Sequence, residues 1–205
     1  AIRPTTRMDH TREAFADALS SGDTEHVNRA IDEIENTELE ERAALFDECF
    51  EMCRDLYEAD DGYQRQSVIR FAAGLYPRLA YRTVGSDLTD EAVPGEWTLD
   101  EIATHRERLR DLYVDALRDD DGRVRRAAAK AIKELALTAE MLEAEDQLRS
   151  MMDELEALAE ECEDSKRKHV EQAYENVAFH AEKPFSLLPD GLRDALEGDE
   201  PSSGR

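Results

Sequence analysis

The apolar residues of this chain recur with the spacing of α-helices. Within 38–58, one helix face carries apolar residues at i, i+4, i+7, i+8 and i+11, namely Leu45, Cys49, Met52, Cys53 and Leu56. No stretch of the sequence alternates apolar and polar residues with the period of two that is typical of strands. The pattern therefore predicts an all-α protein.

The same periodicity predicts eight main helices and a short ninth one. The main helices are expected near residues 9–20, 24–36, 38–58, 62–82, 98–118, 121–138, 140–162 and 166–182, and the short one near 190–197. Thr37 with Glu40, and Thr98 with Glu101, have capping-box spacing at two of the helix starts. We expect a single domain over residues 1–197 with an inserted loop at 83–97, followed by a disordered tail at 198–205.

Two turns between the predicted helices share a sequence. Asp60-Asp61-Gly62 with Arg65 superposes on Asp120-Asp121-Gly122 with Arg125 at an offset of 60 residues. Apolar positions extend the alignment in both directions, so that successive units lie 40, 60 and 42 residues apart. The longest interval contains the 83–97 loop. Spacings near 40 residues that are built from two helices are typical of HEAT-like repeats.

The segment from Leu109 to Leu135, with the turn Asp119-Asp-Asp-Gly-Arg-Val-Arg125 inside it, resembles the HEAT and PBS-lyase HEAT-like repeat families. The resemblance covers residues 100–137 well and 45–80 moderately. It implies an α-solenoid of about four antiparallel helix pairs, whose second helices line a concave face. The pairs would be 9–36, 38–82, 98–138 and 140–182, capped by the short C-terminal helix. An all-α bundle with an enzymatic or regulatory role that only imitates the repeat is an alternative.

Acidic residues outnumber basic ones by 50 to 26, which gives a net charge of -24, and only five of the basic residues are Lys. This composition resembles that of proteins from a salt-accumulating, haloarchaeal-type cytoplasm, where salt screens the repulsion between carboxylates. The sequence has neither a long apolar run nor a signal-peptide pattern, so we expect a cytoplasmic protein without a membrane partner. Cys49 and Cys53 lie on an apolar helix face and are expected in the core, not as metal ligands.

Arg65, Arg125 and Arg167 occupy one position of the repeat. The family resemblance implies a structural ladder, in which each guanidinium bonds an acidic turn residue, such as Asp61 or Asp120, of its own or an adjacent unit. A row of three arginines that faces a ligand is the alternative.

The scarce cations gather at the starts of two predicted helices. Arg123, Arg126, Lys130 and Lys133 stand at i, i+3, i+7 and i+10 on one side of a helix, and Lys166, Arg167, Lys168 and His169 open a later one. Such a patch suits phosphates or an acidic partner, although pairing with nearby carboxylates would also explain it. The candidate partner contacts are Arg123, Arg126, Lys130, Lys133 and Lys168.

Trp97 ends the 83–97 loop and is the only Trp of the chain. A Trp in an exposed loop is a candidate binding hot spot, and we place it at the rim of the groove. A lid that folds back onto neighbouring helices is the alternative.

No motif in the sequence indicates a particular enzymatic reaction, since no glycine-rich phosphate loop occurs and the five His residues are scattered. We expect no cofactor, metal or catalysis. The predicted function is a scaffold or adaptor that binds a protein partner in the groove lined by the second helices. The alternative is a nucleic-acid-binding solenoid related in fold to the alkylation-repair DNA glycosylases, which use aromatic residues on a basic concave face.

Overall fold

The computed structural model describes residues 9–76, 98–142 and 144–182. These residues form eight helices and no strand: α1 (Arg12–Ser20), α2 (Thr24–Asn36), α3 (Leu39–Tyr57), α4 (Gly62–Leu75), α5 (Leu99–Leu117), α6 (Gly122–Met141), α7 (Glu145–Glu161) and α8 (Asp164–Glu182). The all-α prediction is confirmed for this part of the chain. The predicted loop at 83–97 with Trp97, the short helix at 190–197 and the tail lie outside the described residues.

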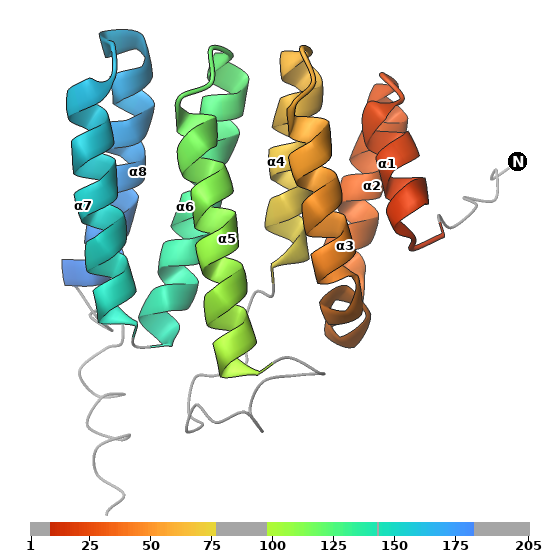
Figure 1. The fold of residues 1–205 in the computed structure, drawn as a ribbon, viewed down its shortest axis with the longest axis horizontal. Helices are drawn as coiled ribbons and strands as arrows, with labels where there is room; N and C mark the ends of the chain where they lie inside the picture. Colours follow the sequence, from red (N-terminus) through yellow and green to blue (C-terminus); the bar gives the residue numbers. More distant parts are fainter. Residues whose placement is uncertain (1–8, 77–97, 143, 183–205) are drawn as a thin grey trace, which may run out of the picture.

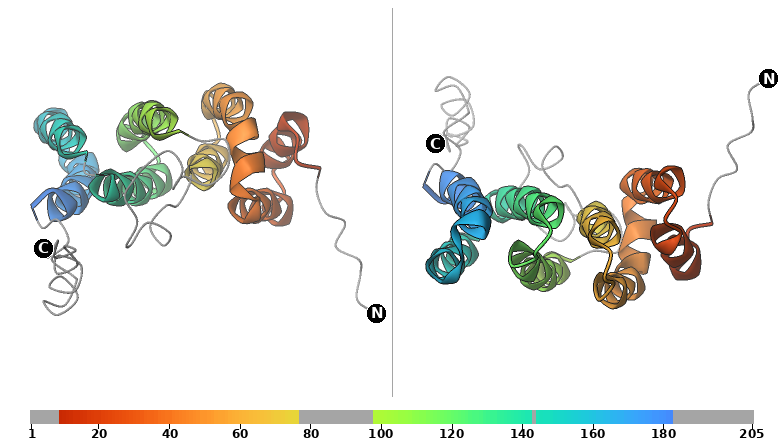
Figure 2. Two further views of the ribbon diagram at one scale, coloured as in Figure 1. Left: turned by 90° about the horizontal axis from the view of Figure 1, so that it is seen from below. Right: turned by 90° about the horizontal axis from the view of Figure 1, so that it is seen from above.

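The helices follow one another along the long axis of the molecule in pairs (Figure 1). The second helices α2, α4, α6 and α8 form a row in which each packs against the next, and each first helix packs against the second helix of its own pair. Figure 2 shows α3, α5 and α7 on one side of α4, α6 and α8. Apart from α1 against α3, the main packing between neighbouring pairs involves a second helix.

Small buried residues let α6 occupy the centre of this row. It packs against α4, α5 and α8, and its buried positions include Ala128, Ala131 and Ala136. Alanine has a high helix propensity and lets neighbouring backbones approach closely, while Ile132 and Leu135 supply larger apolar area. Full burial of one such larger side chain contributes roughly 2 kcal/mol.

Local capping chemistry decides several helix ends. The capping box of α5 is confirmed: the Glu101 N–H donates to Thr98 Oγ1 at 3.2 Å, and the Thr98 N–H donates to Glu101 Oε2 at 2.8 Å. The capping box predicted for Thr37 and Glu40 is wrong. Glu38 is the N-cap of α3, and the Thr37 hydroxyl donates to the Glu33 carbonyl at 2.8 Å. Because α2 ends directly before α3, the Thr37 side chain bonds to the preceding helix.

Two predicted boundaries are wrong. The helix expected to reach residue 82 ends at Leu75, because Tyr76 precedes Pro77 and a residue before proline avoids the helical conformation. The break expected near residue 139 occurs later, since α6 continues through Met141 and α7 begins at Glu145. No Gly or Pro marks that break in the sequence, so the apolar periodicity alone did not locate it.

The three repeated arginines are structural in the way the ladder interpretation expects. Each of them donates to two backbone carbonyls at 2.7–3.0 Å. For Arg65 and Arg125 these carbonyls lie in the turn directly before the helix, and for Arg167 they lie at the C-terminal end of α7. Backbone carbonyls in turns and at helix C-termini have no intrahelical donor, and the guanidinium supplies one. Two of the three also bond an acidic turn residue, as the ladder prediction expects: Arg65 bonds Asp119 of the adjacent unit, and Arg167 bonds Asp164 of its own unit at 3.0 Å. Asp61 and Asp120, the examples named in the prediction, are not their partners.

Asp119, in the turn between α5 and α6, connects two helix pairs. Its carboxylate accepts bonds from Arg65 Nε at 2.7 Å, Arg65 Nη2 at 2.9 Å and the Tyr57 hydroxyl at 2.9 Å, and its side chain is only 6% exposed. We call Tyr57, Arg65 and Asp119 the Asp119 cluster. Since Tyr57 belongs to α3 and Arg65 to α4, this cluster ties the second helix pair to the third.

Gly62 and Gly122 begin α4 and α6 at equivalent repeat positions, but their surroundings differ. A Cβ at Gly62 would lie 2.8 Å from Cγ of Asp121, the N-cap of α6. A Cβ at Gly122 would meet nothing nearer than Arg125 Nη2 at 3.4 Å. Only the first position requires glycine for the close approach of two turns.

Candidate functional site

A groove of about 520 Å³ lies between α6 and α8. Its lining residues are Arg126, Ala129, Lys130 and Lys133 on α6, and Lys168, His169, Gln172 and Asn176 on α8. Both helices run in the same direction in Figure 1. Residues that are one turn apart on each helix therefore line the groove at successive positions along its length. We call this site the α6–α8 groove.

Four of the six predicted contact residues lie in this groove, namely Arg126, Lys130, Lys133 and Lys168. Arg123 does not line it: its Nη2 lies 2.6 Å from Asp121 Oδ2, in the first turn of α6. Trp97 lies outside the described residues. Packing of α6 against α8 therefore joins cations that are 35 or more residues apart in the sequence.

The four groove cations differ from the other described Lys and Arg residues in having no partner. Each of the others has at least one hydrogen bond or ion pair. Within the described ranges, Arg126, Lys130, Lys133 and Lys168 form neither, and all four are exposed. In a chain of net charge -24, this is a local excess of positive charge.

His169 adds a titratable group to the groove. Arg125 Nε donates a hydrogen bond to His169 Nδ1 at 3.4 Å. Burial, followed by the positive charges of Arg125, Lys168 and Arg126, lowers the pKa of His169 below its ordinary value of 6.5. At neutral pH the imidazole is therefore uncharged, with one ring nitrogen that can donate a hydrogen bond and one that can accept.

Carboxylates and one aromatic side chain border the groove. By helical spacing, Glu134 borders it on α6, and Glu171 and Glu175 border it on α8. Phe179 follows Gln172 by seven residues on the same side of α8 and is 46% exposed, more than any other large apolar side chain in the described part. Phe179 is not among the predicted site residues, because it continues the apolar run of Val177 and Ala178, which suggests a core position.

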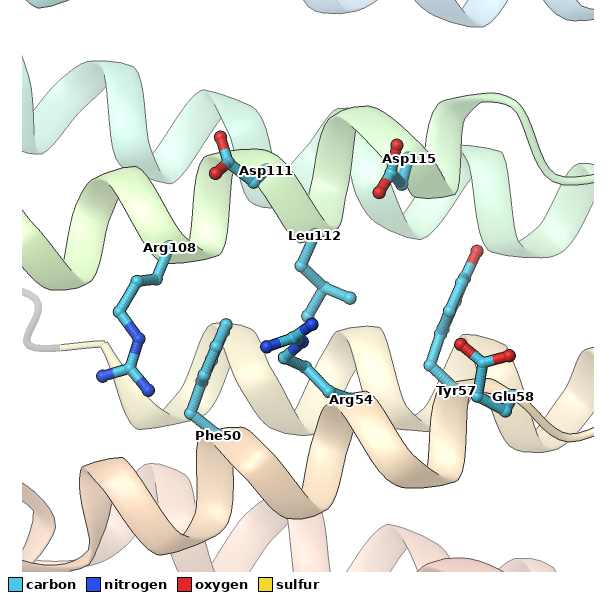
Figure 3. A pocket seen from close by; sticks show the side chains of 8 residues that line it. All are labelled: Phe50, Arg54, Tyr57, Glu58, Arg108, Asp111, Leu112 and Asp115. Carbon is cyan, nitrogen blue, oxygen red and sulfur yellow. The ribbon is translucent and has the colours of Figure 1, made fainter.

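A second cleft, of about 370 Å³, lies between α3 and α5 (Figure 3). Its lining residues are Phe50, Arg54, Tyr57, Glu58, Arg108, Asp111, Leu112 and Asp115. Arg108 lies 4.4 Å from the Phe50 ring centroid and already bonds Asp47 at 2.5 Å and Glu51 at 3.0 Å. The two aspartates of the lining also have arginine partners. Since the arginines and aspartates of this lining already have partners beside the cleft, it attracts an ionic partner less than the α6–α8 groove does.

The chemistry of the α6–α8 groove is positive charge with hydrogen-bond donors. Its lining contains no carboxylate and no thiol. In the described ranges, no three His, Cys, Asp or Glu side chains gather as metal ligands. Cys49 and Cys53 are buried core residues, as predicted, and burial raises the pKa of Cys49 to about 12. Across the same ranges, none of the helices is both long enough and apolar enough to cross a membrane.

No model of a known protein family matches the chain, and no curated protein matches it. Among solved structures, it is similar to an engineered protein known from a crystal structure, with a TM-score of 0.44 and 20% sequence identity. The match covers 82% of this chain and 63% of that one, so this chain spans less than two thirds of the engineered protein. A structural similarity at this level carries no information about function.

Proposed function

We propose that this chain is a non-catalytic scaffold or adaptor of the HEAT-like α-solenoid type, with about four helix pairs, that binds a protein partner in the α6–α8 groove. The observation that carries the proposal is the set of four cations without partners, Arg126, Lys130, Lys133 and Lys168. The row of second helices and the repeated arginine bonds at the turns support the solenoid part of it.

The proposal also places the chain in a salt-rich cytoplasm, on the basis of its acidic surplus. At molar salt the Debye length falls to about 3 Å, so distant charges have little influence. Binding then depends on groups that touch, and a groove that holds several cations side by side provides such direct contacts. A partner that supplied carboxylates would give these cations the bonds that the chain itself does not provide.

The same cations could contact phosphates, which is how a nucleic acid would bind. That interaction weakens by about 0.9 log units for each phosphate contact per log unit of salt. A protein partner is therefore the better candidate at high salt, and nucleic acid is an outcome that the experiment can reveal.

The test is affinity capture from a native lysate in molar KCl, with and without nuclease, read by mass spectrometry. Three baits are compared: the wild type, a groove variant with Lys130→Glu and Lys133→Glu, and a control variant. The control variant carries Arg54→Glu and Arg149→Glu, an equal charge change at exposed sites outside the groove. We expect a stoichiometric partner on the wild-type and control baits that is lost from the groove variant. Undiminished capture by the groove variant, or loss of the partner after nuclease treatment alone, would contradict the proposal.

A further inference from the structure

We infer that the segment held in the α6–α8 groove is a short acidic helix of the partner, with carboxylates one turn apart and one large apolar side chain at its end. This inference rests on the proposed function and names the chemistry of the partner. It is argued from the spacing of the groove cations, from the carboxylates at the borders and from the position of Phe179.

The cations form a pattern that a helix can match. Arg126, Lys130 and Lys133 occupy positions i, i+4 and i+7 of α6, and Lys168 faces the same groove from α8. From Arg126 to Lys133 the rise is about 10 Å, or two helical turns. A helix laid along the groove with carboxylates at i, i+4 and i+7 has the same repeat, so each carboxylate can meet a cation. The small side chain of Ala129 leaves room for its backbone.

The borders of the groove favour a short ligand over a long polyanion. Glu134 on α6, and Glu171 and Glu175 on α8, bring negative charge to both sides of the cations. Duplex DNA carries one charge per about 1.7 Å and extends beyond any patch two turns long, so its phosphates would meet these carboxylates. The rings near the cations are those of His169 in the lining and Phe179 at one end, and they form no row along the groove on which successive bases of a single strand could stack.

Phe179 supplies the apolar end of the site. It lies one turn beyond Asn176 on the groove side of α8, past the last cation, and is 46% exposed. A large exposed aromatic next to a polar groove is a common anchor in protein interfaces. A bound helix with an apolar side chain one turn after its last carboxylate would cover this ring.

The test uses fluorescence anisotropy with the full chain and synthetic peptides. The probe is a labelled, end-capped helical peptide with Glu at i, i+4 and i+7 and Leu at i+11, and a second peptide has the reversed sequence to allow the other orientation. Matched peptides carry Gln in place of Glu, and a 12-nucleotide single-stranded DNA represents phosphate. Circular dichroism verifies that each protein variant is folded.

We expect saturable one-to-one binding of at least one Glu peptide, weakened roughly tenfold or more by Glu-to-Gln exchange in the peptide or by Lys130→Gln with Lys133→Gln in the protein. Phe179→Ala should weaken binding about fivefold, and Arg54→Gln with Arg149→Gln should leave it unchanged. Equal binding of Glu and Gln peptides, tighter binding of the DNA, or no effect of Phe179→Ala would overturn the inference.

The two proposals can fail separately. If neither Glu peptide binds while the captured partner still depends on Lys130 and Lys133, the acidic helix is wrong and the groove remains the binding site. If the variant with Lys130 and Lys133 exchanged captures the partner as well as the wild type does, the proposed function itself is wrong.

Discussion

Replacing Asp119 by Ala should destabilise the protein far more than replacing the adjacent Asp120. The Asp119 carboxylate is 6% exposed, and it accepts two bonds from Arg65 and one from Tyr57. Asp120 is 94% exposed, and its carboxylate bonds only Lys166. The two positions are neighbours in sequence with the same side chain, so their comparison isolates the contribution of the buried cluster.

The expected loss follows from the surroundings of Arg65. Removing one partner of a buried ion pair costs about 3–5 kcal/mol, because the other charge stays behind uncompensated. Arg65 is 17% exposed and keeps its bonds to the carbonyls of Ala59 and Asp60, so the cost should lie near the lower end, at about 3 kcal/mol. Asp120→Ala should leave the free energy of unfolding nearly unchanged, because an exposed ion pair contributes little.

The dependence on pH gives a second readout. Burial by itself would raise the pKa of Asp119, but the bonds from Arg65, from the Asp121 N–H and from Tyr57 outweigh it and hold the pKa below 3.8. A carboxyl whose pKa is lower in the folded state stabilises the protein above its unfolded pKa, and this stabilisation is lost as pH falls through the folded pKa. The difference between wild type and Asp119→Ala should thus be complete at pH 6–7 and shrink below about pH 4.

Urea unfolding followed by circular dichroism, at fixed salt concentration and several pH values, measures both effects. The intermediate variant Asp119→Asn keeps an acceptor without the charge and should fall between wild type and Asp119→Ala. Equal free energies of unfolding for Asp119→Ala and Asp120→Ala would refute the view that the Asp119 cluster joins the second and third helix pairs.

Two further predictions concern the core and the repeated turns. Gly62→Ala should cost about 1–3 kcal/mol in a urea titration because the new methyl group meets Asp121, whereas Gly122→Ala should be neutral or slightly stabilising; equal effects would show that the turns are not in close contact. In Cys162→Ser protein at pH 8, Cys49 and Cys53 should resist a thiol reagent until the protein unfolds, because burial raises the pKa of both thiols. Rapid reaction of the native protein would mean that this part of the core opens easily.

The sequence predicted helices where apolar periodicity and capping residues agree, and it failed where tertiary context selects among local options. The Thr98 capping box follows from its spacing to Glu101, while Thr37 stands between two adjacent helices and serves the earlier one. Pro77 is a local signal for the end of α4, because the residue before a proline, here Tyr76, avoids the helical conformation. The end of α6 at Met141 has no Gly or Pro beside it in the sequence.

The candidate site was predictable in part for a similar reason. Helical spacing within α6 identified Arg126, Lys130 and Lys133, because all three lie on one side of one helix. Arg123 has the right spacing but bonds Asp121, a contact set by the N-cap geometry of the turn. Gln172 could have been found four residues after Lys168 on α8. Pairing between α6 and α8 is a long-range property that periodicity within one helix does not contain.

The division of roles between Arg and Lys supports a binding surface in the α6–α8 groove. Arg65, Arg125 and Arg167 all hold backbone carbonyls at turns, where a planar guanidinium can donate several bonds at fixed angles. Lysine has a flexible stem and a compact charge, and among the described lysines only Lys166 holds a backbone carbonyl of a turn, that of Arg118. Lys130 and Lys133, with the adjacent Arg126, instead remain exposed without a partner.

If the groove cations served only to balance the acidic surplus, they would be expected next to carboxylates, as Lys166 is next to Asp120. Glu134 lies four residues after Lys130 on α6, a spacing that permits an ion pair, yet the two form none. Cations that remain without partners beside available carboxylates are positioned to bind an external anion. Exchanging Lys166 for Gln should therefore leave partner binding unchanged, while Lys130→Gln should reduce it.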